Sequence, residues 1–131
     1  MIDPDLARRD VRCVACGTVV PPFADHHRIL GNRADGRLSN RLLLCGTGNV
    51  PPGCHGLAHK HSRLAREQYG YIVSRHRDRA DTLIQPVLYW QPALGRYPAR
   101  FGWFLLDDTG HLEPVPHIPL PERGLADAIT P

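Results

Sequence analysis

Four cysteines constrain this chain more than any other feature of its sequence. They form two pairs, Cys13-x2-Cys16 and Cys45-x8-Cys54. Two sulfurs on a tight turn that ends at Gly17 can face one ion, and the second pair would complete a tetrahedral zinc site with Zn–S distances of about 2.3 Å. Two disulfides or four unrelated thiols are the alternatives, and the absence of an apolar export signal near the start favours zinc. A closed four-sulfur site is structural, so any chemistry must come from other residues.

Length and composition predict one small globular domain. The chain has 131 residues, 42% of them apolar, which suffices for one modest core. No apolar run reaches the roughly 20 residues of a membrane span, so we expect no membrane partner and a cytoplasmic location. Residues 1–80 carry 13 Lys or Arg against 7 Asp or Glu, whereas residues 81–131 carry 3 against 6. Nearly all of the cations are Arg, whose planar fork suits phosphate.

We expect three parts within this compact domain. Residues 1–12 form a peripheral arm in which a helix begins near Asp3-Pro4. Residues 13–79 form the functional core, and residues 80–131 form a β-hairpin extension with a Pro-rich tail, partly flexible beyond Pro116.

The local patterns also predict the main elements. A helix is expected over residues 55–69, with an apolar stripe at 57/61/64/65/68 and Gly70 as its left-handed stop. β-prone runs bounded by turn residues predict strands elsewhere. These strands cover residues 18–20, 23–28, 42–44, 71–73, 86–90, 103–106 and 111–115, the last two joined by a turn over 107–110.

Two histidines on the predicted helix form a candidate metal-ligand pair. His55 and His59 are four residues apart, so they lie on one helix face and can reach the same ion. The alternative is that both are polar side chains that face solvent near a helix start. The residues around them decide between the two interpretations.

The order of motifs resembles the HNH endonuclease family, particularly its cysteine-bearing phage members. Asp25-His26-His27-Arg28 comes first, then Asn40 before the apolar run that ends at Cys45, and then Cys54-His55 with His59. The similarity runs from Cys13 to about Val73, and the His-x3-His pair looks most like the nuclease colicins. It implies an α+β fold with a ββα-metal (His-Me finger) nuclease core, to which the four-cysteine zinc site and the C-terminal β-rich extension are added.

The resemblance also implies roles for individual residues. His26, His55 and His59 would hold one catalytic divalent cation, and His27 would be the general base. Asp25-His26 fits the family's ligand-base pattern as well, one residue earlier. Three neutral nitrogens suit Zn2+, Ni2+ or Mn2+, whereas an Asp25 ligand would favour Mg2+ or Mn2+.

Three further residues complete the expected site. Asn40 matches the family's asparagine and would bind the metal or brace the loop and orient His27, with a plain turn residue as the alternative. Arg28 and Arg63 are expected to bind phosphate, on a rim with other arginines. That rim also includes Arg33, Arg37, Arg41 and Arg66.

The C-terminal half is expected to close a small sheet against the nuclease core, and docking of a partner is the alternative. Its net charge is negative, which makes it a poor DNA surface. Its aromatic residues are interpreted as core residues. They are Trp90, Tyr97, Phe101, Trp103 and Phe104.

The expected function is a metal-dependent DNA endonuclease that leaves 5′-phosphate and 3′-hydroxyl ends. Its partner is DNA, and its expected location is the host bacterium's cytoplasm. The likeness to phage proteins implies a role beside terminase subunits in DNA packaging, or else in phage DNA processing, homing or host attack. The competing hypothesis is a noncatalytic zinc-binding module that holds nucleic acid or protein. A secreted disulfide protein is a third, which free thiols would exclude.

Overall fold

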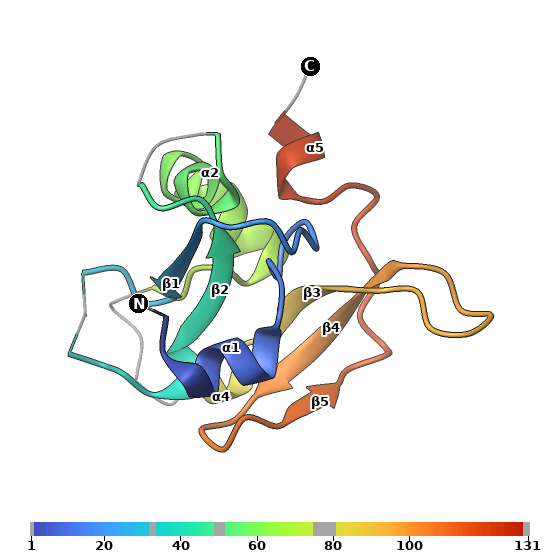
Figure 1. The fold of residues 1–131 in the computed structure, drawn as a ribbon, viewed down its shortest axis with the longest axis horizontal. Helices are drawn as coiled ribbons and strands as arrows, with labels where there is room; N and C mark the ends of the chain where they lie inside the picture. Colours follow the sequence, from blue (N-terminus) through green and yellow to red (C-terminus); the bar gives the residue numbers. More distant parts are fainter. Residues whose placement is uncertain (1, 32–33, 49–51, 75–80, 130–131) are drawn as a thin grey trace.

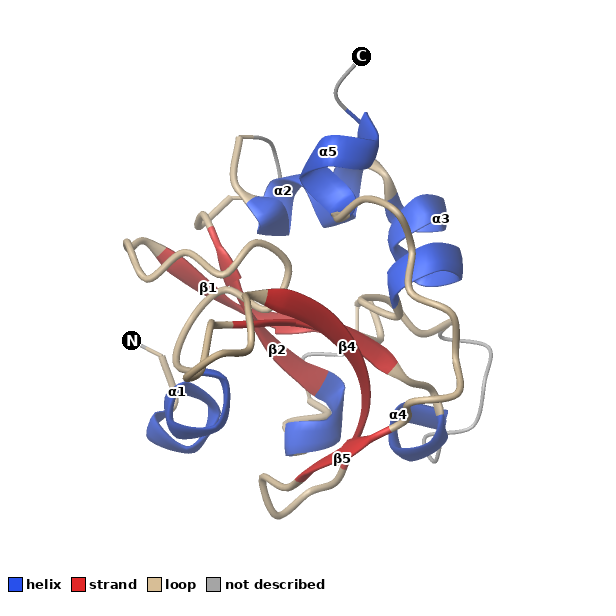
Figure 2. Ribbon diagram, turned by 90° about the vertical axis from the view of Figure 1, so that its right-hand side faces the viewer, coloured by secondary structure: helices blue, strands red, loops and turns tan. Residues whose placement is uncertain are grey.

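The computed structural model is a small mixed α/β fold with two small sheets (Figures 1 and 2). It describes residues 2–31, 34–48, 52–74 and 81–129. The predicted boundary near residue 79 therefore lies outside the described residues. The elements, in chain order, are α1 (Pro4–Asp10), β1 (Phe23–His27), η1 (Leu38–Asn40), β2 (Arg41–Cys45), α2 (Cys54–Lys60), α3 (Ser62–Leu64), η2 (Ala65–Tyr69), α4 (Asp81–Ile84), β3 (Val87–Gln91), β4 (Arg100–Leu106), β5 (Leu112–Pro114) and α5 (Leu125–Ile129).

The first sheet is an antiparallel pair of β1 and β2, in which His26 lies opposite Leu42. Its strands correspond to the predicted segments 23–28 and 42–44. The predicted strand over residues 18–20 does not form, and Val19 and Val20 are exposed there. The residues between Cys16 and β1 therefore form a loop.

The second sheet is an antiparallel meander of β3, β4 and β5. The predicted hairpin between the last two strands is confirmed. Its turn is held by Asp107, whose carboxylate accepts hydrogen bonds from the backbone N–H groups of Thr109 (2.8 Å) and His111 (3.0 Å). An aspartate that bonds to the backbone two residues ahead is a common turn device.

Helix α1 belongs to the core, so the expectation of a peripheral arm is wrong. Asp3 caps the helix by accepting a hydrogen bond from Asp5 N–H (2.8 Å), as the Asp-Pro start predicts. Leu6 is fully buried. Asp10 is buried too, and its carboxylate accepts a hydrogen bond from the backbone N–H of Leu43 in β2 (2.9 Å).

The predicted helix over residues 55–69 forms in three pieces. It breaks at His61, with φ −114° and ψ 51°, and its last turn, η2, is a π-helix. Three members of the predicted stripe, Leu57, Leu64 and Ala65, pack in or against the core, together with Cys54, Ala58 and Tyr69. Gln68 is exposed, so the stripe is confirmed only in part.

The predicted stop at Gly70 is confirmed, with φ +72°. A Cβ atom at this position would lie 2.0 Å from the carbonyl oxygen of Pro86, so the close approach also requires glycine. Gly70 thus lets the end of the helix pack directly against the start of the second sheet.

One hydrophobic core joins both halves of the described chain. It contains Leu42 and Leu44 of the first sheet together with Leu88 and Phe104 of the second. The tail contributes as well, because Leu125 in α5 is fully buried and α5 packs against α2. The Pro-rich tail, expected to be partly flexible, therefore includes a short helix that packs on the rest of the protein. In the described part of the chain, no helix has the length and apolar character needed to cross a membrane.

Candidate metal centres

The four cysteines come together from three parts of the first half. Cys13 and Cys16 lie on a turn that ends at Gly17, where φ is +79°. Cys45 ends β2, and Cys54 begins α2 and donates its backbone N–H to the Cys45 sulfur (3.3 Å). The four sulfurs lie within 4.8 Å of one another, and all four thiols are free.

The geometry of these sulfurs fits a structural metal ion. A tetrahedral site with Zn–S bonds of about 2.3 Å places its sulfurs about 3.8 Å apart. The Sγ atoms of Cys16 and Cys45 are 3.8 Å apart. Hydrogen bonding with Cys13 lowers the pKa of Cys45 and lowers the pKa of Cys16 to about 7. The spacing of the four sulfurs therefore suits a structural metal site.

Three histidines form a second cluster. His26 extends from β1, and His55 and His59 extend from α2. One ring nitrogen from each lies within 4.8 Å of the others, and the Nε2 atoms of His55 and His59 are 3.1 Å apart. The ring centroid of His26 lies 5.2 Å from that of His55 and 5.6 Å from that of His59. The sequence thus brings a strand histidine to the helix pair.

Hydrogen bonds to backbone carbonyls fix which nitrogens face the centre of this cluster. His26 donates from Nε2 to the carbonyl oxygen of Tyr71 (2.7 Å), and His55 donates from Nδ1 to that of Gly48 (3.0 Å). A carbonyl only accepts, so the opposite nitrogen of each ring keeps its lone pair. Nδ1 of His26 is buried and has no hydrogen-bond partner among the described residues. Metal-binding histidines typically show this outer-shell arrangement.

Burial also keeps these rings in the form that binds metal. It lowers the pKa of the fully buried His26 to about 3 and lowers the pKa values of His55 and His59. All three rings are therefore neutral at pH 7, which a metal ligand requires. An ion held by these three nitrogens alone would keep at least one coordination position open, unlike an ion held by the four sulfurs.

His27 and Asp25 lie next to this cluster in sequence but differ in their contacts. His27 is half-buried and directly follows His26 at the end of β1. The carboxylate of Asp25 instead accepts hydrogen bonds from the guanidinium of Arg41 at 2.5–3.2 Å. The ligand cluster therefore contains His26, and Asp25 is held in an ion pair outside it.

Asn40 braces the loop after β1. Its Oδ1 accepts a hydrogen bond from the backbone N–H of Ile29 (2.9 Å), and its Nδ2 donates to the carbonyl oxygen of Asp35 (2.9 Å). The side chain is fully buried, and both of its polar atoms are used. Of the roles considered for Asn40, these contacts fit bracing and leave no atom for a metal.

Arg28 cannot bind phosphate, which corrects the sequence-based expectation. Its side chain is fully buried and donates hydrogen bonds to four backbone carbonyls. Burial lowers its pKa to about 9. The sequence placed this arginine beside two histidines but could not show that the chain closes over it. The four acceptors belong to Gly70, Ser39, Thr82 and Gln85.

The other arginines of the expected rim divide into paired and exposed groups. Arg37 and Arg41 form ion pairs with Asp35 and Asp25. Arg63 is exposed on α3 and contacts Glu67 one turn ahead (3.2 Å). Arg66 is exposed as well, and Arg33 lies outside the described residues. The described rim is thus reduced to the outer face of α3 and η2.

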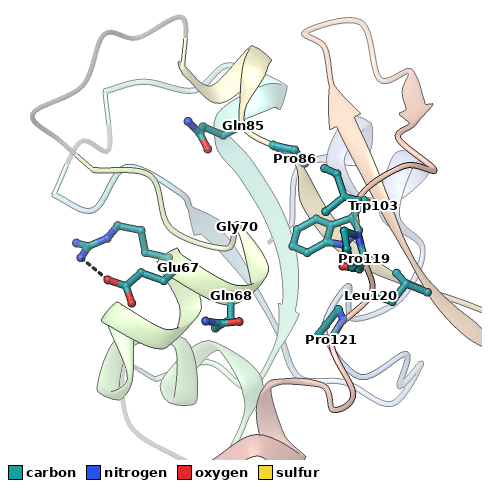
Figure 3. Close-up of a pocket in the computed structure, with 11 residues that line it drawn as sticks. Glu67, Gln68, Gly70, Gln85, Pro86, Trp103, Pro119, Leu120 and Pro121 are labelled. Carbon is teal, nitrogen blue, oxygen red and sulfur yellow. Dashed lines mark hydrogen bonds and ion pairs between the residues drawn. The ribbon is translucent and has the colours of Figure 1, made fainter.

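A groove of about 420 Å³ lies beyond the helix end and apart from both clusters (Figure 3). Figure 3 shows Glu67 and Gln68 on one wall and Trp103 and Pro119 on the other. Its described lining contains none of the clustered histidines or cysteines. The candidate chemistry therefore lies at the histidine cluster and not in this groove.

Sequence reasoning missed two groups that orient the cluster, the carbonyls of Tyr71 and Gly48. Every residue has a carbonyl, so no sequence signal marks them. No protein-family model matches this chain, and neither the curated proteins nor the solved structures contain a match. The functional argument therefore starts from the geometry of the two clusters.

Proposed function

We propose that this protein is a metal-dependent DNA endonuclease of the HNH type. The observation that carries the proposal is the buried, unpartnered Nδ1 of His26, grouped with the ring nitrogens of His55 and His59 and followed directly by His27. The order of elements supports it, because an antiparallel strand pair is followed by the helix that carries the other two ligands. A buried nitrogen without a partner is costly unless something binds it.

In this proposal the three clustered histidines hold one divalent cation. When bound, the cation would stabilise negative charge on the phosphate and on the departing 3′ oxygen. His27 extends from the same strand as His26 and is partly accessible, so in this proposal it takes a proton from an attacking water. The products would carry 5′-phosphate and 3′-hydroxyl ends.

The cysteine cluster has a positioning role in the same proposal, with zinc as its ion. Cys45 ends the strand that pairs with β1, and Cys54 begins the helix that carries His55 and His59. A shared ion between these points would fix the helix relative to the strand pair. The distance between strand and helix ligands would therefore depend on the sulfur site.

A nicking assay on supercoiled plasmid tests the proposal. We expect nicking by the wild type with Mg2+, Mn2+, Ni2+ or Zn2+ and none with EDTA. His27→Ala should lower the rate by at least about 10²-fold while its circular dichroism and zinc content stay unchanged. His111→Ala, at an exposed position, serves as the matched control and should cleave like the wild type.

A noncatalytic zinc-binding module is the second candidate, and the paired arginines favour it. Arg28 is buried, and Arg37 and Arg41 are paired with aspartates, so three of the arginines expected to bind phosphate are engaged within the protein. This candidate predicts salt-sensitive retention of plasmid without nicking under any ion. Nicking that survives His27→Ala would contradict the first proposal.

A further inference from the structure

The tip of the β3–β4 hairpin projects from the body of the protein (Figure 1). Its turn is well formed, because Leu94 and Tyr97 exchange backbone hydrogen bonds of 2.9 Å in both directions. Gly95 begins the turn with φ +56°, a conformation that a hairpin turn of this kind requires of its first central residue. The tip therefore presents its side chains from an ordered backbone.

Two guanidinium groups contact one aromatic ring at this tip. The Cζ atoms of Arg96 and Arg100 lie 5.7 Å and 5.5 Å from the centroid of the Tyr97 ring. Both arginines are exposed, and the tyrosine side chain is 52% exposed. The interpretation of Tyr97 as a core residue is therefore wrong. Instead the ring orders two cations that would otherwise sample many rotamers.

The charge of this tip is not neutralised by the protein. No Asp or Glu occurs between residues 82 and 106. Among the described residues, neither Arg96 nor Arg100 forms an ion pair, whereas Arg9, Arg37 and Arg41 all do. The half of the chain with a negative net charge thus concentrates two of its three cations on one projecting hairpin.

We propose that this hairpin tip, defined as residues 94–100, binds the phosphate backbone of DNA. Two guanidinium forks on one ring, without carboxylate partners among the described residues, suit phosphodiester oxygens, which arginine binds in bidentate fashion. Tyr97 acts as a positioning residue that holds both forks. The choice of DNA as the partner rests on the proposed function, whereas the contact itself requires no cleavage.

Fluorescence anisotropy with a labelled duplex of about 20 base pairs tests the contact, using zinc-loaded protein without any further divalent cation. Arg96→Ala/Arg100→Ala should raise Kd about tenfold or more and lower the slope of log K against log salt by about two. Arg8→Ala/Arg123→Ala is the matched control, since it removes two exposed cations elsewhere. We expect the control to change Kd less than about twofold.

Substitutions of the ring separate positioning from simple charge. Tyr97→Phe keeps the aromatic face and should bind like the wild type, whereas Tyr97→Leu should weaken binding about threefold with the net charge unchanged. The tip is exposed, so circular dichroism should be the same for all of these variants. Equal Kd values for Tyr97→Phe and Tyr97→Leu, both like the wild type, would overturn the positioning role.

Three results would overturn the proposal as a whole. They are equal losses in the tip and control double variants, a wild type that does not bind the duplex, and binding to phosphatidylserine vesicles in place of the duplex. Failure of the nuclease proposal has a separate signature, because tip-dependent DNA binding without nicking would leave this inference standing. Nicking together with DNA binding that does not depend on the tip would support the nuclease proposal and overturn this inference.

Discussion

The two candidate metal-binding clusters of this protein differ in their ligands and in the elements that carry them. The cysteine cluster offers four sulfurs and closes a coordination sphere. The histidine cluster offers three nitrogens and leaves room for another ligand. The cysteines lie on a turn and at the ends of elements, whereas the histidines lie within a strand and a helix. Groups that must keep a fixed geometry are better placed on regular elements.

Both clusters nevertheless depend on one strand. β2 carries Cys45 at its end and pairs with His26 through Leu42. Helix α1 holds the same strand, because the backbone N–H of Leu43 donates a hydrogen bond to Asp10. We therefore expect that removal of a ligand lowers the free energy of unfolding by very different amounts in the two clusters. Changes in the buried residues that hold both clusters in place should affect both.

The largest expected effect on stability follows loss of a sulfur. Cys54 is 3% exposed and holds the start of α2, so Cys54→Ser should abolish tight zinc binding and cooperative thermal unfolding together. Metal content by mass spectrometry and a melting curve measure both. A variant that keeps its zinc and its melting temperature would show that the cysteines are not a structural site.

Loss of the buried arginine should come next. Arg28→Met leaves four carbonyls without their donor, so we expect the free energy of unfolding to fall by about 3–5 kcal/mol. Urea denaturation of the zinc-loaded protein measures this change. Arg63→Met, at an exposed position, is the matched control and should stay within about 0.5 kcal/mol. Equal free energies of unfolding for the two variants would contradict the structural role of Arg28.

A smaller, pH-dependent effect is expected at Tyr89. Its buried hydroxyl donates to Asp10 (2.8 Å), and burial raises the pKa of Tyr89 well above 10. The unfolded chain therefore releases this proton first, so stability is fully present below pH 10 and falls as pH rises above it.

Tyr89→Phe should cost about 1–3 kcal/mol at pH 7, because a hydrogen bond to a carboxylate is lost. Above pH 10 its unfolding free energy should fall less steeply than that of the wild type. Urea denaturation at pH 7, 9 and 11 provides the comparison, with Tyr97→Phe as the control for an exposed tyrosine. Parallel pH curves for Tyr89→Phe and the wild type would refute the assignment.

Loss of a histidine ligand should change stability least. His59→Ala should alter the unfolding free energy of the zinc-loaded protein by less than about 1 kcal/mol, since the ring is only partly buried. Affinity for an added ion should nevertheless fall about 10²-fold or more in isothermal titration. His111→Ala should leave that titration unchanged. An unaltered affinity in His59→Ala would break the comparison between a closed and an open cluster.

Local sequence rules predicted the elements that depend on near neighbours. The capped start at Asp3, the stop at Gly70 and the turn at Asp107 follow from interactions within a few residues. The same rules failed for the 18–20 segment and predicted only part of the helix face that packs on the core, because packing against distant segments decides both. Propensity is a weak guide when tertiary contacts oppose it.

The sequence by itself determined the types and spacing of the ligands: two cysteine pairs, a histidine pair at helix spacing and a His-His step on a strand. Only the tertiary structure decided which histidine joins the helix pair, that Asp25 turns to Arg41 instead, and that Arg28 is enclosed while Arg96 and Arg100 are not. Spacing is a property of the chain, whereas burial and partner choice depend on segments tens of residues apart. Those contacts form only when the whole core closes.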